Sequence, residues 1–373
     1  MQSFNPPDVL LLGPGPSPVP QRVLDALARP TIGHLDPRFV ALMDQVKALL
    51  QWALATNNAI TLPISGPGSA GMEAVFTNLV EPGDTVIVCR NGVFGERMRQ
   101  NVVRLGGSAS IVDDDYGQPV DPDKVEAALK ANPGAKALAF VHAETSTGAR
   151  SDAQTLCALA REHGALSIVD AVTSVGGIRV DTDAWGVDAI YSGSQKCLSA
   201  PPGLAPLSLG QRAVAAMQAR RQPVSSWFLD LSLVLDYWQD SAGGGRSYHH
   251  TAPVNMLYGL HEALLMLRAE GLEAAIARHL DSHRRLRDGL ETLGLELRGD
   301  ERWRLPQLNV VTVPEGVDEA AVRHQLLHGH HIEIGAGLGP LAGKVWRIGL
   351  MGHGSRIENV DRVLAALKQV LGR

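Results

Sequence analysis

The sequence predicts an α/β protein in which a large domain with a mostly parallel sheet precedes a smaller α+β domain. Short apolar runs alternate with helical stretches between residues 60 and 209, a pattern typical of parallel strands covered on both faces. After about residue 253, two long amphipathic helices are followed by a shorter mixture of strands and helices. We therefore expect an N-terminal arm at residues 1–16, a large domain at 17–265 and a small domain at 266–373.

The individual elements follow from local patterns. Prolines and glycines in the arm favour extended backbone, which is expected to be frayed or to lie on a partner subunit. A helix capped by Ser17 is expected over 17–29. The expected strands of the large domain are Ile60–Ile64, Thr85–Cys89, Ala109–Val112, Ala137–His142, Leu166–Asp170, Asp188–Ser192 and Leu207–Leu209. The expected helices include Phe39–Ala53, Met72–Val80, Val125–Ala131 (capped by Asp121), Ala153–His163, Val254–Glu270 and Leu272–Leu293.

Composition and charge exclude several classes of protein. The 373 residues carry a net charge of −5 without basic blocks, which argues against nucleic acid as a partner. The three cysteines form no CxxC pair and suit a reducing compartment. No basic region precedes the short apolar run Val9–Leu12, so neither a signal peptide nor a membrane span is expected. We expect a cytoplasmic protein with no membrane partner.

Lys196 is the residue around which the other motifs are arranged. It follows the expected strand Asp188–Ser192 and precedes a turn-rich stretch, 197–203. A partly desolvated amine at such a junction can form a Schiff base with an aldehyde cofactor. Because most lysines are simply exposed, this motif alone does not separate a catalytic lysine from a surface one.

A glycine-rich loop, Gly66–Gly71, follows a strand and opens a helix. It matches the dinucleotide fingerprint G-x-G-x-x-G, but the next strand ends in Arg90 rather than in an acid. Arg90 would suit a 2′-phosphate, so an NADP enzyme remains an alternative, as does a plain helix start. The more general interpretation is an anion site formed by free backbone N–H groups of Gly68, Ser69 and Ala70.

Asp170 ends an apolar strand 26 residues before Lys196, about one helix–strand unit. The two residues are therefore expected at the same edge of neighbouring strands, where parallel sheets bind ligands. A carboxylate there can hold a protonated pyridine nitrogen or a metal, or it can cap a helix. The polar cluster Glu144–Gly148 follows another strand, and Arg347 in an apolar strand requires a partner, either a structural acid or a substrate carboxylate. The histidines have no metal-binding pattern, so no metal is expected.

In order along the chain, these motifs resemble class V (fold-type I) pyridoxal-phosphate aminotransferases, closest to alanine–glyoxylate and serine–pyruvate or serine–glyoxylate aminotransferases. The resemblance covers almost the whole chain. It includes the segments Leu12–Ser17, Gly66–Glu73, Glu144–Gly148, Val169-Asp170, Tyr191–Lys196, Pro201–Gly203, Tyr248–Thr251 (which follows the glycine run 243–245), Gly337–Pro340 and Arg347–Gly349.

The resemblance implies a role for each motif. Lys196 would hold pyridoxal 5′-phosphate as a Schiff base, Asp170 would pair with its ring nitrogen, and Arg347 would bind the carboxylate of the substrate. Thr145 would hydrogen-bond the phenolic oxygen of the ring and also contact the substrate, with Gly33 nearby. The other residues implied at the cofactor are Gly68, Ser69, Ala70, Phe94, Val172 and Gln195, with Tyr248 and Thr251 supplied by the second subunit of a homodimer.

The implied reaction moves an amino group from alanine or serine to glyoxylate or pyruvate. This chain departs from several relatives at three positions. Phe94 stands where they have a tryptophan, Pro67 where some have a hydroxyl residue and Ser69 where some have a histidine. These differences make the identity of the substrate harder to predict. The alternatives are a class V aminotransferase with another donor, such as 2-aminoethylphosphonate or ureidoglycine, or a desulfurase-like lyase. The lyase would need a cysteine in the last third, whereas the last cysteine is Cys197. A non-catalytic protein would have lost Lys196, Asp170 or Arg347.

Overall fold

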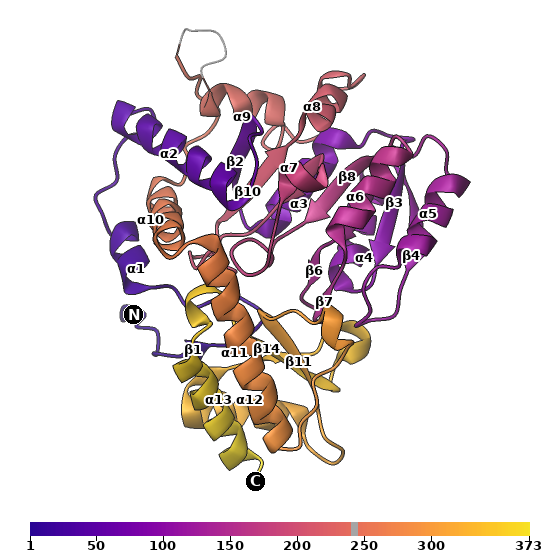
Figure 1. Cartoon of the computed structure of the whole chain (residues 1–373). Coiled ribbons are helices and arrows are strands. Elements are labelled where there is room, and N and C mark those ends of the chain that lie inside the picture. The colour runs from indigo at the N-terminus through magenta and orange to yellow at the C-terminus, as the bar shows by residue number, and fades with distance from the viewer. Residues whose placement is uncertain (240–244) are drawn as a thin grey trace.

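The computed structural model describes residues 1–239 and 245–373 (Figure 1). Its centre is a seven-stranded sheet with the order β2-β10-β9-β8-β5-β3-β4. Only β10 runs antiparallel to its neighbours, β2 and β9. The predicted α/β class with a mostly parallel sheet is therefore confirmed. Gly243 and Gly244 of the glycine run lie outside the described residues.

The strands of this sheet are short, and all but the partly exposed edge strand β4 are mostly buried because their sequences are largely apolar. They are β2 (Ile60–Ser65), β3 (Thr85–Arg90), β4 (Ser108–Asp113), β5 (Ala137–Val141), β8 (Leu166–Asp170), β9 (Ala189–Tyr191) and β10 (Leu204–Leu209). The helices of this part are α1 (Gln21–Leu27), α2 (Pro37–Ala53), α3 (Gly68–Leu79), α4 (Val93–Arg104), α5 (Pro122–Ala131), α6 (Ala153–Glu162), α7 (Thr182–Trp185), α8 (Gln211–Gln218), α9 (Leu231–Trp238) and α10 (Val254–Glu270). As expected, Asp121 caps α5 by accepting from the Asp123 N–H (2.9 Å).

A second hydrophobic core forms around a three-stranded sheet with the order β11-β14-β13. Its elements are α11 (Leu272–Thr292), β11 (Leu308–Thr312), α12 (Glu319–His330), β12 (Ile332–Glu333), β13 (Gly335–Ala336), β14 (Val345–Gly349) and α13 (Ile357–Val370). Figure 1 shows this part, in orange and yellow, below the central sheet. The predicted boundary between residues 265 and 266 lies within α10, and the division into domains stays a prediction.

The N-terminal arm was expected to be frayed or to lie on a partner subunit. The last third of the arm instead binds to its own chain, so the expectation is wrong for these residues. Strand β1 (Leu10–Leu11) pairs in parallel with β12. The next residue, Leu12, is fully buried in the second core, and its carbonyl accepts from the Gly349 N–H (2.7 Å). Burial of Leu12 and partial burial of Leu10 and Leu11 explain the pairing, which the expectation from proline and glycine content did not anticipate.

Ser17 is not a helix cap, which corrects a second expectation. Helix α1 begins at Gln21 and its N-cap is Pro20. The Ser17 hydroxyl donates instead to the carbonyl of Lys196 (2.7 Å), and the Ser17 N–H donates to the carbonyl of Gln195 (2.9 Å). The segment from Leu10 to Ser17 therefore joins the second core to the loop that carries Lys196.

Substitution of Leu12 tests this packing. Leu12→Ala should lower the free energy of unfolding by about 2–5 kcal/mol, because it leaves a cavity in a closed core. Leu24→Ala is the control, since Leu24 is 42% exposed, and it should change the free energy by about 0.5 kcal/mol or less. Urea unfolding followed by circular dichroism measures both, and equal stability of the two variants would contradict the packed arm.

Candidate active site

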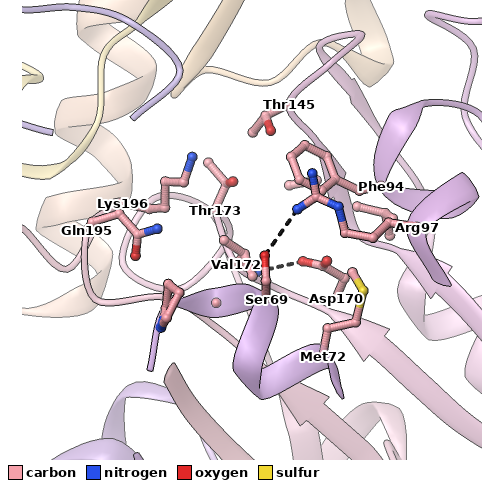
Figure 2. Close-up of a pocket in the computed structure, with 14 residues that line it drawn as sticks. Ser69, Met72, Phe94, Arg97, Thr145, Asp170, Val172, Thr173, Gln195 and Lys196 are labelled. Carbon is pink, nitrogen blue, oxygen red and sulfur yellow. Dashed lines mark hydrogen bonds between the residues drawn. The ribbon is translucent and has the colours of Figure 1, made fainter. Parts of the chain in front are cut away.

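A cavity of about 220 Å³ opens at the carboxyl edge of the central sheet (Figure 2). It is the place where most of the predicted site residues meet. Those that line it are Gly68, Ser69, Phe94, Thr145, Asp170, Val172, Gln195 and Lys196. The other lining residues are Pro67, Met72, Arg97, Val141, Ala143 and Thr173.

Strand register brings Asp170 and Lys196 to the same edge, as expected. Asp170 at the end of β8 is paired with Val141 of β5 on one side and with Tyr191 of β9 on the other. Lys196 lies five residues beyond Tyr191 in the loop between β9 and β10. Ligands of parallel sheets bind at such carboxyl ends.

Asp170 is a buried carboxyl without an ion-pair partner in the described part of the chain. One oxygen accepts from the Val172 N–H (2.9 Å) and the other accepts from the Tyr191 hydroxyl (3.0 Å). Burial raises the pKa of Asp170 to about 7, although both hydrogen bonds favour the ionised form. A cation beside this carboxyl would restore a low pKa, so the site is suited to a protonated ring nitrogen.

Lys196 is partly buried and is held by the N-terminal segment. Its amine donates to the carbonyl of Pro14. Gly15 lies against the side chain with a φ of +110°, and a Cβ there would come within 2.8 Å of the Lys196 Cδ, so only glycine fits. Burial lowers the pKa of Lys196 to about 8, and the positive charge of Arg347 contributes.

The glycine-rich loop is the N-terminus of α3, a helix of 12 residues. In the described structure, the N–H groups of Gly68 and Ser69 have no protein acceptor, as the anion-site interpretation expects. The Ala70 N–H, however, donates to the carbonyl of Pro67 (2.7 Å). The expectation of a free donor at Ala70 is therefore wrong, because this N–H forms a hydrogen bond within the first turn of the helix.

Phe94 reaches the cavity from the start of α4, and Glu144 holds it there. The buried Glu144 carboxylate accepts from the Phe94 N–H (3.1 Å) and from the Ser146 hydroxyl (2.6 Å). Burial raises the pKa of Glu144, and these hydrogen bonds oppose that effect. A carboxylate at a helix N-terminus is favoured by the helix dipole.

Arg347 lies beside the cavity rather than among its lining residues. Its guanidinium donates to the carbonyls of Ala336 (2.6 Å) and Thr145 (3.0 Å). Burial lowers the pKa of Arg347 to about 10. No acidic side chain pairs with it in the described residues, so the structural ion pair considered from the sequence is absent there. Gly33 is exposed and also lies outside the lining.

Tyr248 and Thr251 lie away from this cavity, at the surface. Tyr248 is 61% exposed, and its ring lies 5.3 Å from the ring of His34, next to Gly33. Between them, His250 bonds Ser65 at the end of β2 (2.7 Å) and His249 (2.8 Å). The chain's own fold therefore holds this segment on the outside of β2.

Comparisons with known proteins agree on one family. The profile for class-V aminotransferases matches residues 9–363. An alanine–glyoxylate aminotransferase of Drosophila melanogaster is 38% identical over 98% of this chain and 93% of its own, and an (S)-ureidoglycine–glyoxylate transaminase of Bacillus subtilis is 37% identical over 97% and 90%. The structure of an alanine–glyoxylate aminotransferase from Nostoc sp. has a TM-score of 0.97 and 45% identity, covering 100% of this chain and 97% of that one. The chain belongs to the class-V aminotransferase family.

This aminotransferase uses pyridoxal 5′-phosphate, and its substrates are amino acids and keto acids. The cavity fits the cofactor. Lys196 provides a partly buried amine, and Asp170 provides a buried carboxyl that forms no ion pair with the residues that the structure describes. The side-chain oxygen of Gln195 is buried and has no partner in the described residues, and two N–H groups at the start of α3 have no acceptor there.

The NADP alternative is wrong, because the chain belongs to the aminotransferase family and Arg90 forms ion pairs outside the cavity. Its guanidinium pairs with Asp113 (2.6 Å) and Glu96 (2.9 Å) and does not line the cavity. In the described residues, no group of three or more metal-binding side chains occurs. Among the same residues, no helix combines the length and apolar character needed to cross a bilayer.

Sequence reasoning missed Arg97 and the role of Tyr191. Arg97 stands one helical turn after Phe94, so a helical spacing of three from a predicted site residue was the available signal. Tyr191 was recognised as part of a strand and of the segment Tyr191–Lys196, but without a role of its own, and its hydroxyl bond to Asp170 depends on the register between β8 and β9. A single sequence does not reveal that register.

The lowered pKa of Lys196 predicts an unusual pH dependence of its chemistry in the full-length apoenzyme. At pH 7 about a tenth of its amine should be unprotonated, far more than for a lysine with the ordinary pKa of about 10.4. Carbamylation by cyanate, followed by peptide mass spectrometry, should therefore rise with pH to a midpoint near 8. Arg347→Met should move this midpoint upward because it removes a positive charge, and a wild-type midpoint above 10 would contradict the desolvated site.

Proposed function

We propose that the enzyme transfers the amino group of alanine or serine to glyoxylate, with pyruvate as the second acceptor. The observation that carries this proposal is the similarity to alanine–glyoxylate aminotransferases over the full chain, at 45% identity for the Nostoc structure. The cavity supports it, because it is small, at about 220 Å³, and the cofactor would fill much of it. Little space is then left for a long side chain.

Two residues of this chain would perform the chemistry. When bound, pyridoxal phosphate supplies an aldehyde that takes up the amino group and a ring that withdraws electrons from it. Asp170 would hold a proton on the ring nitrogen, and its carboxyl is suited to this because no other cation pairs with it in the described structure. Lys196 would accept the proton from the α-carbon of the substrate at Nζ, since its low pKa leaves a useful fraction unprotonated.

The remaining residues would bind and orient. Gly68, Ser69 and Gln195 would hold the phosphate, and Phe94 and Val172 would contact the two faces of the ring. Ala70 would contribute through packing, because its N–H is used within the helix. The phosphate would also be bound by Tyr248 of the partner subunit and Thr251 of the partner subunit.

Arg347 would bind the substrate carboxylate. Its bonds to two backbone carbonyls use the Nε and Nη1 atoms, which leaves donors on the guanidinium for a charge-assisted contact. Thr145 would hydrogen-bond the phenolic oxygen of the ring and lie beside the substrate. Gly33 is proposed to approach the substrate site across the subunit interface, since it lies outside the cavity of its own chain.

A dicarboxylate substrate would need a second cationic side chain, and two loop arginines that could supply it, Arg38 and Arg246, are paired elsewhere. Arg38 is exposed and bonds Asp36 (2.6 Å), and Arg246 pairs with Asp44. Neither lines the cavity. Their positions support small monocarboxylate substrates.

A substrate panel tests the proposed reaction. Alanine and serine with glyoxylate should give the highest kcat/KM among alanine, serine, aspartate, glutamate and (S)-ureidoglycine, each with glyoxylate, pyruvate and 2-oxoglutarate. Arg347→Ala should lower kcat/KM for alanine by a factor that corresponds to about 2 kcal/mol or more. Ureidoglycine as the best donor would favour the function named for the Bacillus relative, and glutamate with 2-oxoglutarate as the best pair would contradict a small-substrate site.

We also propose that the enzyme is a homodimer that shares its active sites. Three large hydrophobic side chains near the Tyr248 segment are exposed, namely Trp227 (63%), Phe228 (40%) and Tyr248 itself (61%). The Trp227 ring stacks on His249 at 4.4 Å, and Phe228 contacts His250. Such a patch is typical of a protein interface, and a second copy would bring Tyr248 to the phosphate site. The cytoplasmic location stays a prediction from the sequence.

The dimer can be disrupted at its proposed centre. Light scattering should give twice the mass of one chain for the wild type, and Trp227→Glu should give a monomer that retains pyridoxal phosphate poorly. Leu280→Glu is the control, because Leu280 is exposed (37%) on α11, outside the aromatic patch. A wild-type protein that is monomeric and fully active would refute the shared site.

A further inference from the structure

Arg97 is a positively charged side chain of the active-site cavity. None of the roles proposed above gives it an anionic partner. Three ionisable side chains line the cavity, namely Asp170, Lys196 and Arg97. Lys196 is assigned to the aldehyde of the cofactor and Asp170 to its ring nitrogen. Arg97 forms no ion pair with any of the residues that the structure describes, although Arg90 and Arg99, on either side of it in sequence, both pair with Glu96. Arg97 is exposed to solvent but also lines the cavity, so its guanidinium is placed to bind an anionic ligand there.

The position of Arg97 identifies which part of the cavity that anion would occupy. One turn of α4 after Phe94, its Nη1 donates to the Ser69 hydroxyl (3.1 Å), and its Cζ lies 4.8 Å from the centre of the Phe94 ring. Figure 2 shows the guanidinium beside Phe94 and directed toward Ser69. It therefore lies at the N-terminus of α3, where backbone N–H groups already favour an anion.

The glycine-rich loop has too few donors of its own for a phosphate. Pro67 has no N–H, and the Ala70 N–H is used by the Pro67 carbonyl. The loop therefore offers the N–H groups of Gly68 and Ser69 and the Ser69 hydroxyl. A phosphate monoester carries a charge of about −1.5 to −2 and three acceptor oxygens, whereas a helix N-terminus provides only about half a positive charge. The other groups proposed above for the phosphate, Gln195 and the partner's Tyr248 and the partner's Thr251, are neutral donors, so Arg97 is the side chain beside Ser69 that brings a full positive charge.

We infer that Arg97 is a cofactor-binding residue that donates charge-assisted hydrogen bonds to the phosphate of pyridoxal phosphate. Its bond to Ser69 holds the guanidinium at the edge of the anion site, and its contact with Phe94 limits its rotation. The inference rests on the cofactor of the family and not on the proposed amino donor or acceptor. Failure of the substrate proposal would therefore leave it unaffected.

The test compares two ligands that differ only in the phosphate. Full-length apoenzyme is titrated with pyridoxal phosphate and with pyridoxal, and binding is followed by absorbance. Arg97→Gln should weaken pyridoxal phosphate about 10- to 100-fold, which is the usual effect of losing a hydrogen bond to a charged group, and should change pyridoxal by less than about threefold. Arg97→Lys should recover part of the loss because it retains the charge. Arg104→Gln is the matched control, since Arg104 is exposed on the same helix.

Inorganic phosphate provides a second measurement. It should compete with pyridoxal phosphate for the wild type and compete less well for Arg97→Gln, whose thermal unfolding is recorded to verify that the variant is folded. Equal weakening of both ligands would overturn the inference, because Arg97 would then act only through Phe94 and the ring. Unchanged cofactor affinity together with a raised KM for aspartate or glutamate would also overturn it and would assign Arg97 to a second substrate carboxylate.

Discussion

Hydrogen bonding between β5, β8 and β9 places Val141, Asp170 and Tyr191 in one row at the carboxyl edge of the sheet. This register has to be held, because a slip of one residue in β8 would turn the carboxyl of Asp170 to the other face of the sheet. It also brings the Tyr191 hydroxyl to Asp170 and sets the point at which the chain enters the Lys196 loop. The helices that cover the sheet keep this row dry, and burial in turn shifts the pKa of both Asp170 and Lys196 toward neutrality.

Much of this arrangement could be predicted from the sequence, because it depends on local pattern and spacing. Apolar runs of four to six residues separated by helical stretches identify the parallel sheet. Glycine at 271 separates two helices that the structure ends at Glu270 and begins at Leu272. The distance of one helix–strand unit between Asp170 and Lys196 predicts that they share an edge, and it was sufficient to bring them together without knowledge of the register.

The parts that could not be predicted depend on contacts between distant segments. Ser17 has the residue type of a helix cap, yet its hydroxyl bonds the carbonyl of Lys196, 179 residues away. Leu10 and Leu11 gave no sign in sequence of a partner strand at Ile332. The free donor expected at Ala70 failed for a local reason, since the carbonyl of the N-cap residue, here Pro67, accepts the first hydrogen bond of the helix. Arg97 resembled any charged residue on a surface helix until the cavity beside it was known.

The N-terminal segment also bears on how the protein is made on the ribosome. Its partners in the second core, from His331 to Gly349, are synthesised well after the central sheet, whose last strand in sequence, β10, ends at Leu209. Domains usually fold in the order in which they emerge. The central sheet can thus form during translation while Gly15 and Ser17 are still without their anchor. The lysine loop therefore acquires its N-terminal support only after the second core has been synthesised, later than the sheet edge on which it lies.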